Sequence, residues 1–526
     1  MTRFLIATMR SYLFYGVLAI SLMLIVSFQL RHKEFNSIDG APNIIATYHA
    51  LLTATALDES SAGHHWYLPT VSLGKEIDKN IPWGATVKTK TGDYIYTSFY
   101  SPGFVAPHLW FKTLQIAPSE INLVRFNFML GCISALALFF LLTDLLIHNG
   151  FSRLTASASA TIGCFIGVFS REALLSHGVT YWSQSLYQPI LIGSLFFYLK
   201  YLTANSERLK KTHAAALILF AFSGPLIEWT GYVFNAGLVV LLWMNSKQSP
   251  CSRTMAIKIL AATALAGAVT LTHLALAVGL SPAIDALLGR FVARGTSAGS
   301  LAGLSSGYGQ SYGLFLIVVI ALGITILINY KQSSSAHRRT TLLILIASTT
   351  PLIENILMLQ HATVFSFDRL KLIPLAALII ALAFASYKNI GRITLIIFII
   401  ASSVQNYIVY RSDISAFSKW GEINKENKIL ALNTTRDINP NCTIFTSSIG
   451  VRGYANLLFH HGIYEYVTTD DSLKLLHFRK GCALVHLDGF FAFPDLPAYT
   501  RATITKDTGE TRIVESQKNL SVSQKQ

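Results

Sequence analysis

A chain of 526 residues that is 52% hydrophobic and 13% charged, with a mean hydropathy of +0.47, departs from soluble globular proteins toward membrane proteins. Its formal charge of +15 is spread over short basic clusters between apolar runs, and such a pattern argues against a nucleic-acid-binding stripe. We therefore expect an α-helical polytopic membrane protein.

Eleven apolar segments are candidate transmembrane helices, since about 20 apolar residues cross a bilayer. The first, from Tyr12 to Leu30, is longer than the apolar core of a typical signal peptide and is expected to be an uncleaved helix. The other segments lie near residues 122–147, 154–170, 186–203, 213–228, 231–245, 256–280, 312–330, 341–359, 371–387 and 393–410. The pair 213–228 and 231–245 is so closely joined that a tight hairpin and a re-entrant pair both fit.

Lysine and arginine are concentrated in alternate connecting loops. When the spans are threaded in order, the basic loops, such as those at Lys211 and Arg339, fall on the side of the N-terminus. The positive-inside rule places that side in the cytoplasm. The long segment 31–121 and the tail after Tyr410 are therefore both expected to face away from the cytoplasm.

The first loop, residues 31–121, is mostly polar and must lie outside hydrocarbon, where unpaired backbone groups are costly. Within it, Pro42 to Leu57 has apolar residues at helical spacing, which predicts a helix along the outer membrane surface. Asp39 comes just before this helix, and a helix N-terminus favours an ionised carboxylate. On the residues alone, a simple Asp-Gly turn is the favoured explanation of Asp39 and Gly40.

The loop also contains side chains of the kinds that bind metal ions. Asp58 and Glu59 are followed by His64 and His65, but their spacing matches no fixed metal-ligand motif. We assign no metal ligands, and a divalent cation is left open as a cofactor.

Charged residues at the expected outer ends of the later spans are candidates for function, because ionisable groups at membrane depth are costly. They are Glu228, Arg290, Arg294, Glu354, His361, Asp368, Arg369 and Lys371. The basic residues among them either bind phosphate or anchor the helices at the interface. The glycine-rich segment 296–313 has little preferred structure, and we expect a loop that orders over a bound lipid or an idle linker.

The tail, residues 412–526, is more polar than the rest of the chain. Strand-like segments at 443–446, 465–468 and 483–486 alternate with helix-like segments at 453–461 and 472–479. This alternation predicts a small C-terminal α/β domain, separate from a transmembrane domain at residues 1–411. Cys442 and Cys482 each precede a strand, and we expect a disulfide between them if those strands are neighbours in an oxidising compartment.

Taken together, the first helix, the large first loop, the many later spans and the external tail resemble the GT-C glycosyltransferases, which use polyprenyl-phosphate sugars in bacterial envelopes. The resemblance covers residues 1 to about 410 and is carried by Asp39, the Tyr96–Gly103 motif and the His361–Lys371 segment. It implies that an acidic residue of the first loop is the general base. Asp39 holds the matching position, with Glu34 as the fallback, because the acidic pair often found there is absent.

The resemblance also implies a set of binding residues. Donor-phosphate binding is expected of Arg290, Arg294, Arg369 and Lys371, and substrate binding of Tyr96, Ser98, Tyr100, Glu228 and His361. The chemistry requires cations for the charge that grows on a departing lipid phosphate and a carboxylate that takes a proton from the acceptor hydroxyl.

The expected function is transfer of a single sugar, with inversion, from a polyprenyl-phosphate carrier to an envelope glycan or lipid acceptor on the periplasmic face of a bacterial inner membrane. The partners would be the lipid-linked donor, the acceptor and membrane lipid. An O-antigen polymerase or ligase is a related alternative, although those proteins usually place their main external loop late in the chain. A transporter would predict two halves with matching hydropathy, which the sequence does not display.

Overall fold

The structure, a computed structural model, describes residues 2–36, 38, 42–72, 86–98, 100–247, 249–295, 299–329, 335–419, 421–422 and 425, together with four strands between residues 443 and 516. Each of the eleven apolar segments lies on a helix. These helices are α1 (Thr2–Leu30), α6 (Glu120–His148), α7 (Arg153–Phe169), α9 (Ser183–Thr203), α10 (Glu207–Ile227), α11 (Thr230–Asn245), α12 (Pro250–Val278), α15 (Leu314–Asn329), α16 (Ser335–Leu357), α18 (Ile373–Ser386) and α19 (Asn389–Ala416).

By length and composition, six spans within the described residues are able to cross a membrane. A seventh is added if α14 (Leu301–Tyr312) and α15, which meet at a bend of 103°, are taken as one broken span. The membrane-protein class expected from the sequence is therefore confirmed, and the count of eleven crossings stays a prediction.

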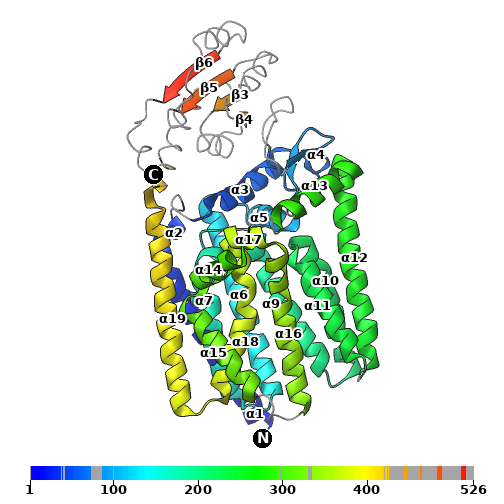
Figure 1. Cartoon of the computed structure of the whole chain (residues 1–526), viewed down its shortest axis with the longest axis vertical. Helices are drawn as coiled ribbons and strands as arrows, with labels where there is room; N and C mark the ends of the chain where they lie inside the picture. Colours follow the sequence, from blue (N-terminus) through cyan, green and yellow to red (C-terminus); the bar gives the residue numbers. More distant parts are fainter. Residues whose placement is uncertain are drawn as a thin grey trace.

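The long helices stand side by side, and short elements gather at the end of the bundle opposite the N-terminus, which we call the outer end (Figure 1). The C-terminal end of α19 lies at this outer end as well. The short elements of the chain are α2 (His32–Asn36), α3 (Ile44–Glu59), α4 (Ala62–His65), β1 (Thr86–Lys88), β2 (Tyr94–Tyr96), α5 (Pro102–Leu114), α8 (Arg171–Ser176), α13 (Leu280–Arg294), α17 (Leu359–Val364) and the 3₁₀ helix η4 (Ser366–Leu372). Strands β1 and β2 pair antiparallel.

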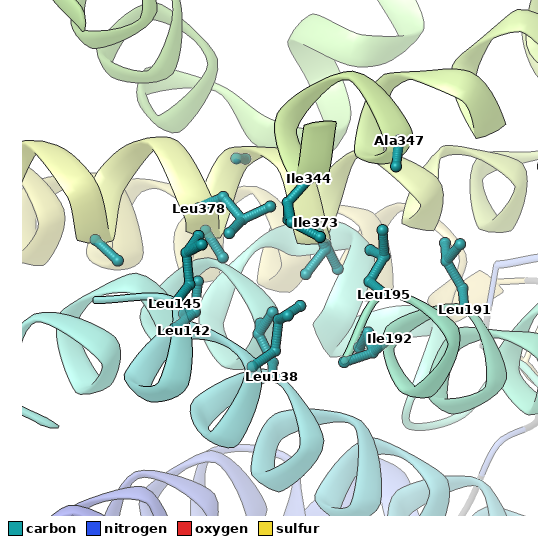
Figure 2. Close-up of a cluster of buried hydrophobic side chains, with 14 of the residues drawn as sticks. Leu138, Leu142, Leu145, Leu191, Ile192, Leu195, Ile344, Ala347, Ile373 and Leu378 are labelled. Atoms are coloured by element: carbon teal, nitrogen blue, oxygen red, sulfur yellow. The ribbon is translucent and has the colours of Figure 1, made fainter. Parts of the chain in front are cut away.

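Leucine and isoleucine side chains from α6, α9, α16 and α18 form the centre of the bundle (Figure 2). Each is at most 2% exposed, and on α6 they recur four and then three residues apart, on one helix face. The residues labelled in the figure are Leu138, Leu142, Leu145, Leu191, Ile192, Leu195, Ile344, Ala347, Ile373 and Leu378. On the outside of the bundle large apolar side chains such as Ile320 and Ile397 are more than half exposed, as lipid-facing residues would be.

The helix expected at residues 42–57 is confirmed as α3, but its surroundings differ from the expectation. Ala50, Leu51 and Ala54 are at most 3% exposed and belong to a cluster that includes Phe104 of α5 and Phe126 of α6. The apolar face that we expected to lie on the membrane therefore packs against protein, because the aromatic side chains of the neighbouring helices cover it.

The expectation that residues 296–313 have little structure is wrong for most of the segment, since Leu301–Tyr312 forms α14. The hydroxyl of Ser300 caps this helix by accepting a hydrogen bond from the backbone N–H of Gly303 at 2.9 Å. A Cβ at Gly307 would lie 2.6 Å from a guanidinium nitrogen of Arg369. The glycine at position 307 thus allows α14 to approach a buried arginine.

A buried arginine fastens the start of the first loop to the bundle. Arg31 is 2% exposed, and its Nη1 donates to the carbonyls of Leu174 at 2.8 Å and His177 at 3.0 Å. The ring of His177 is also buried, and neither of its nitrogens has a hydrogen-bond partner among the described residues. Burial, with a smaller contribution from Arg31, lowers the pKa of His177 to about 3.

This buried histidine predicts that the protein loses stability as the pH falls below about 6.5, the ordinary histidine pKa. Between that value and about 3 the unfolded chain binds a proton that the folded chain rejects, so stability rises with pH. At pH 5 the loss attributable to His177 is about 2 kcal/mol relative to pH 8. Thermal unfolding in detergent across this range is expected to be less pH-dependent in His177→Leu, whereas His32→Gln, on the exposed surface, keeps the wild-type slope. Equal slopes in all three proteins would contradict the prediction.

Beyond α19 the structure describes four strands, β3 (Thr443–Thr446), β4 (Ile463–Tyr464), β5 (Ala483–Asp488) and β6 (Thr511–Ser516). They form a parallel sheet in the order β4-β3-β5-β6, an arrangement typical of α/β proteins. Strands β3 and β5 are direct neighbours, with Thr443 opposite Ala483. The strand expected at 465–468 lies outside the described residues, just after β4.

Other parts of the expected C-terminal domain lie outside the described residues. These are Cys442, Cys482 and the helix-like segments 453–461 and 472–479. The disulfide and the domain boundary near residue 411 therefore stay predictions, and α19 itself continues to Ala416.

Candidate functional site

A small hollow, partly open to solvent, lies between the end of the first loop, the α10–α11 connection and helices α12 and α13. We call it the outer hollow. Aromatic rings and polar groups line it together, from Thr97, Tyr100, Glu228, Trp229, Tyr232 and Thr270. Two of the residues that sequence analysis selected for substrate binding, Tyr100 and Glu228, are among them.

The α10–α11 connection directs two side chains toward the first loop. It is tight because Gly231 packs onto the backbone of Gly224, where a Cβ would collide. Glu228 Oε2 accepts a hydrogen bond from the backbone N–H of Thr230 at 2.6 Å, and the indole of Trp229 donates to the carbonyl of Ser98 at 2.8 Å. The connection and the loop are thereby joined at the hollow.

Helix α13 brings two arginines to the same place. Arg290 Nε donates to Ser98 Oγ at 2.6 Å, and Arg294 Nη2 donates to the hydroxyl of Tyr96 at 3.3 Å. Arg290 is half-buried and Arg294 is 4% exposed. The opposite face of α13 exposes large apolar side chains, including Leu288 at 59%, as expected of a helix at a membrane interface. Four predicted site residues, Tyr96, Ser98, Arg290 and Arg294, are therefore adjacent.

Beneath the hollow, four ionisable side chains that are at most 3% exposed form what we call the buried ionic cluster, Glu228, Glu354, Asp368 and Lys371. Lys371 Nζ pairs with Glu354, lies 3.6 Å from Asp368 Oδ1, and donates to Asn355 Oδ1 at 2.9 Å. The lysine charge is thus balanced by carboxylates of the protein.

Gln184 links the hollow to this cluster. Its amide nitrogen donates to Glu228 Oε1 at 3.1 Å and to Asp368 Oδ1 at 2.6 Å. The other oxygen of Asp368 accepts a hydrogen bond from His361 Nδ1. Burial lowers the pKa of His361 to about 4, so the imidazole is neutral and donates its Nδ1–H.

Arg369 is not among the residues that line the hollow, and its guanidinium is hydrogen-bonded to other groups of the protein. Its Nε donates to Ser311 Oγ at 2.7 Å, and its Nη1 donates to the carbonyl of Ala362 at 2.8 Å. Ser311 in turn donates to Glu172 Oε2 at 2.9 Å. With 3% of its surface exposed, Arg369 joins α14 to α17 and lies among protein groups.

Of the two acidic residues selected as candidate bases, the structure describes one. Asp39, the first choice, lies outside the described residues. Glu34, the fallback, is 7% exposed and pairs with Arg411 at the end of α19. The structure therefore shows a partner for Glu34 that holds the last long helix against the start of the first loop.

The acidic and histidine side chains of the first loop were considered as possible ligands of a divalent cation. In the structure they have partners within the protein. His64 Nδ1 lies 2.7 Å from Asp93 Oδ2, and Asp58 lies 3.5 Å from His108. Within the described residues, no three histidine, cysteine or acidic side chains converge as a metal site. These described residues do not fit a divalent cation.

Sequence analysis missed several residues of the site. Gln184, Trp229, Tyr232 and His273 came to notice only when the helices were assembled, since each is a single polar or aromatic residue within or beside an apolar span. The available signal in the sequence was the run Tyr181–Gln184, whose polar residues lie at the start of an apolar span. In the structure the residues of this run are at most 5% exposed.

Comparison with known proteins tests the fold. No family model and no curated protein sequence matches the chain. The structure of ArnT from Cupriavidus metallidurans bound to undecaprenyl phosphate aligns with a TM-score of 0.57 over 88% of each chain, at 9% identity. The archaeal oligosaccharyltransferase AglB from Archaeoglobus fulgidus, in complex with an inhibitory peptide and a dolichol-phosphate, aligns with a TM-score of 0.53 over 86% of this chain, at 10% identity.

The chain has the GT-C fold. The AglB alignment spans 64% of that longer protein, whereas apo ArnT aligns over 84% of its length with a TM-score of 0.52. The GT-C resemblance inferred from the sequence is confirmed at the level of the fold. The roles of the individual site residues rest on the contacts described above, since identities of 8–10% carry no residue assignments.

Proposed function

We propose that this GT-C protein transfers a single sugar from a polyprenyl-phosphate carrier to an envelope glycan or lipid acceptor at the outer end of the bundle. In a bacterial inner membrane, this end would face the periplasm. The observation that carries the proposal is the convergence of two arginines, Arg290 and Arg294, with an aromatic hollow at this end. A lipid phosphate and a sugar ring need these two environments side by side.

The arginines take the donor phosphate in this proposal. Arg290 is half-buried beside the hollow and hydrogen-bonded to a neutral hydroxyl, so a phosphate oxygen can share its guanidinium at little cost. Lys371 and Arg369, the other two residues expected to bind phosphate, are engaged by carboxylates and by backbone carbonyls respectively. We therefore place the phosphate at Arg290 and Arg294.

The proposed reaction is a displacement at the anomeric carbon of the sugar. The acceptor oxygen forms a bond to the anomeric carbon while the bond from that carbon to the phosphate oxygen breaks, and the bonding electrons stay on the phosphate. Asp39 accepts the proton of the acceptor hydroxyl. Arg290 and Arg294 stabilise the charge that grows on the phosphate. A single displacement of this kind inverts the configuration of the anomeric carbon.

The experiment that tests the function is mass spectrometry of envelope glycans and lipids from cells with and without the protein. A product that loses one sugar residue when the protein is absent supports the proposal and names the sugar and the acceptor. Unchanged glycans together with altered uptake of small molecules would favour the transporter alternative.

A second prediction concerns the phosphate ligand. Arg290→Gln is expected to weaken binding of undecaprenyl phosphate by about 10-fold or more, because a charge-assisted hydrogen bond contributes about 1.5 to 3 kcal/mol. Binding to the purified protein in detergent can be followed by native mass spectrometry. Arg253→Gln is the matched control, since Arg253 packs over Trp243 on the part of α12 far from the hollow. Equal affinities for the two variants would remove Arg290 from the phosphate site.

A further inference from the structure

A chain of hydrogen bonds fixes the direction in which the Tyr100 hydroxyl points its hydrogen. His273 Nε2 lies 2.7 Å from the backbone carbonyl of Trp66, which can only accept, so Nε2 carries the hydrogen of a neutral ring. His273 Nδ1 is then an acceptor, and it lies 2.6 Å from the hydroxyl of Tyr100. Burial raises the pKa of Tyr100 to about 12, so the hydroxyl keeps its hydrogen and donates it to His273. Toward the hollow, the Tyr100 oxygen can therefore only accept a hydrogen bond.

A second tyrosine lines the hollow. Tyr232 lies beside Thr270 there, and its ring adds aromatic surface.

Glu228 adds a second acceptor. Its two oxygens each receive a hydrogen bond from the protein, from Gln184 and from the backbone of Thr230, and these bonds hold the carboxylate in place. The indole hydrogen of Trp229 points away to the carbonyl of Ser98, so the tryptophan contributes an aromatic ring to the hollow. Two fixed acceptors, Tyr100 and Glu228, and aromatic surface therefore converge at one place.

We propose that the outer hollow selects a sugar whose polar groups donate hydrogen bonds, and that it rejects sugars bearing a carboxylate. This inference rests on the proposed function and adds the chemical class of the sugar. A neutral sugar can direct hydroxyl hydrogens to Tyr100 and Glu228, and an amino sugar can do so with its ammonium group. A carboxylate would face the lone pairs of Tyr100 and Glu228, with the nearby arginines already engaged by the phosphate.

In this scheme Tyr100 contacts the sugar, and His273 is a positioning residue that acts through it. Replacing His273 by leucine frees the Tyr100 hydrogen, which can then be donated into the hollow. The selectivity between a neutral and an acidic sugar is therefore expected to fall, an effect that general loosening of the structure would not produce. His273→Asn is the conservative variant, because its Oδ1 can replace Nδ1 as the acceptor.

The experiment measures the binding of three lipids to the purified full-length protein in detergent. The probes are undecaprenyl phosphate, undecaprenyl-phosphate-glucose and undecaprenyl-phosphate-glucuronic acid. We expect the wild-type protein to bind the glucosyl lipid at least about 10-fold more tightly than the glucuronosyl lipid. Tyr100→Phe should weaken the glucosyl lipid about 10-fold and leave undecaprenyl phosphate unchanged, because it removes one acceptor. Tyr67→Phe, an exposed tyrosine of the same loop, is the matched control.

The selectivity ratio decides the proposal. It should shrink several-fold in His273→Leu and return toward the wild-type value in His273→Asn. A wild-type protein that binds undecaprenyl phosphate but does not distinguish the two sugars, or a ratio that is the same in His273→Leu, would overturn the selectivity while leaving the function standing. A wild-type protein that binds none of the three lipids would overturn the proposed function itself.

Discussion

Asp39→Asn is expected to reduce sugar transfer at least about 100-fold, which is the range that general-base catalysis supplies. The amide has nearly the shape of the carboxylate but cannot take the proton of an acceptor hydroxyl. Binding of undecaprenyl phosphate should persist, because the proposed phosphate ligands are on α13. Transfer can be measured in cells by the mass of the envelope product, and binding can be measured on the purified variant.

Two further variants give this prediction its contrast. Asp144→Asn, in the ion pair with Lys200 on α6 and α9, is the matched control and is expected to transfer normally. Glu34→Gln breaks the pair with Arg411. It should lower the unfolding temperature and have little effect on sugar transfer by the folded protein. If Asp39→Asn transferred sugar normally and Glu34→Gln did not, the base would be Glu34, and the loop would have to rearrange to free it.

The helices could be predicted from the sequence because a membrane leaves few choices. A span needs a long apolar run with its backbone groups paired internally, so the segments found by hydropathy each returned as helices. The glycine-rich segment at 301–312 was misjudged for a reason of the same kind. Its glycines predicted a flexible segment. In the folded chain, the absence of a side chain at Gly307 leaves room for Arg369.

The functional site was harder to predict, because hydrogen-bond direction depends on partners from distant parts of the chain. Tyr100 was selected, but its acceptor character comes from His273, 173 residues away. The four basic candidates looked alike in sequence, since each was expected at the outer side of the membrane, in or beside a short loop. Arg290 meets a hydroxyl, and Lys371 meets two carboxylates. Such partners are set by packing, which local sequence does not encode.

Lys371→Met is expected to destabilise the protein by about 3 to 5 kcal/mol, the usual cost of leaving a buried charge without its partner. Lys371 is 2% exposed and lies between Glu354 and Asp368, both of which are at least as buried. Its removal leaves two carboxylates facing each other without the cation that they contact in this cluster. Thermal unfolding in detergent measures the loss.

The double variant Lys371→Met/Glu354→Gln should recover part of this stability, because it removes one of the two stranded charges. Lys200→Met provides the comparison, since its pair with Asp144 is about one third exposed and its loss should cost about 1 kcal/mol or less. If Lys371→Met were as stable as the wild-type protein but failed to bind undecaprenyl phosphate, Lys371 would be a phosphate ligand after all. In that case the carboxylates would have to release the lysine when the donor binds.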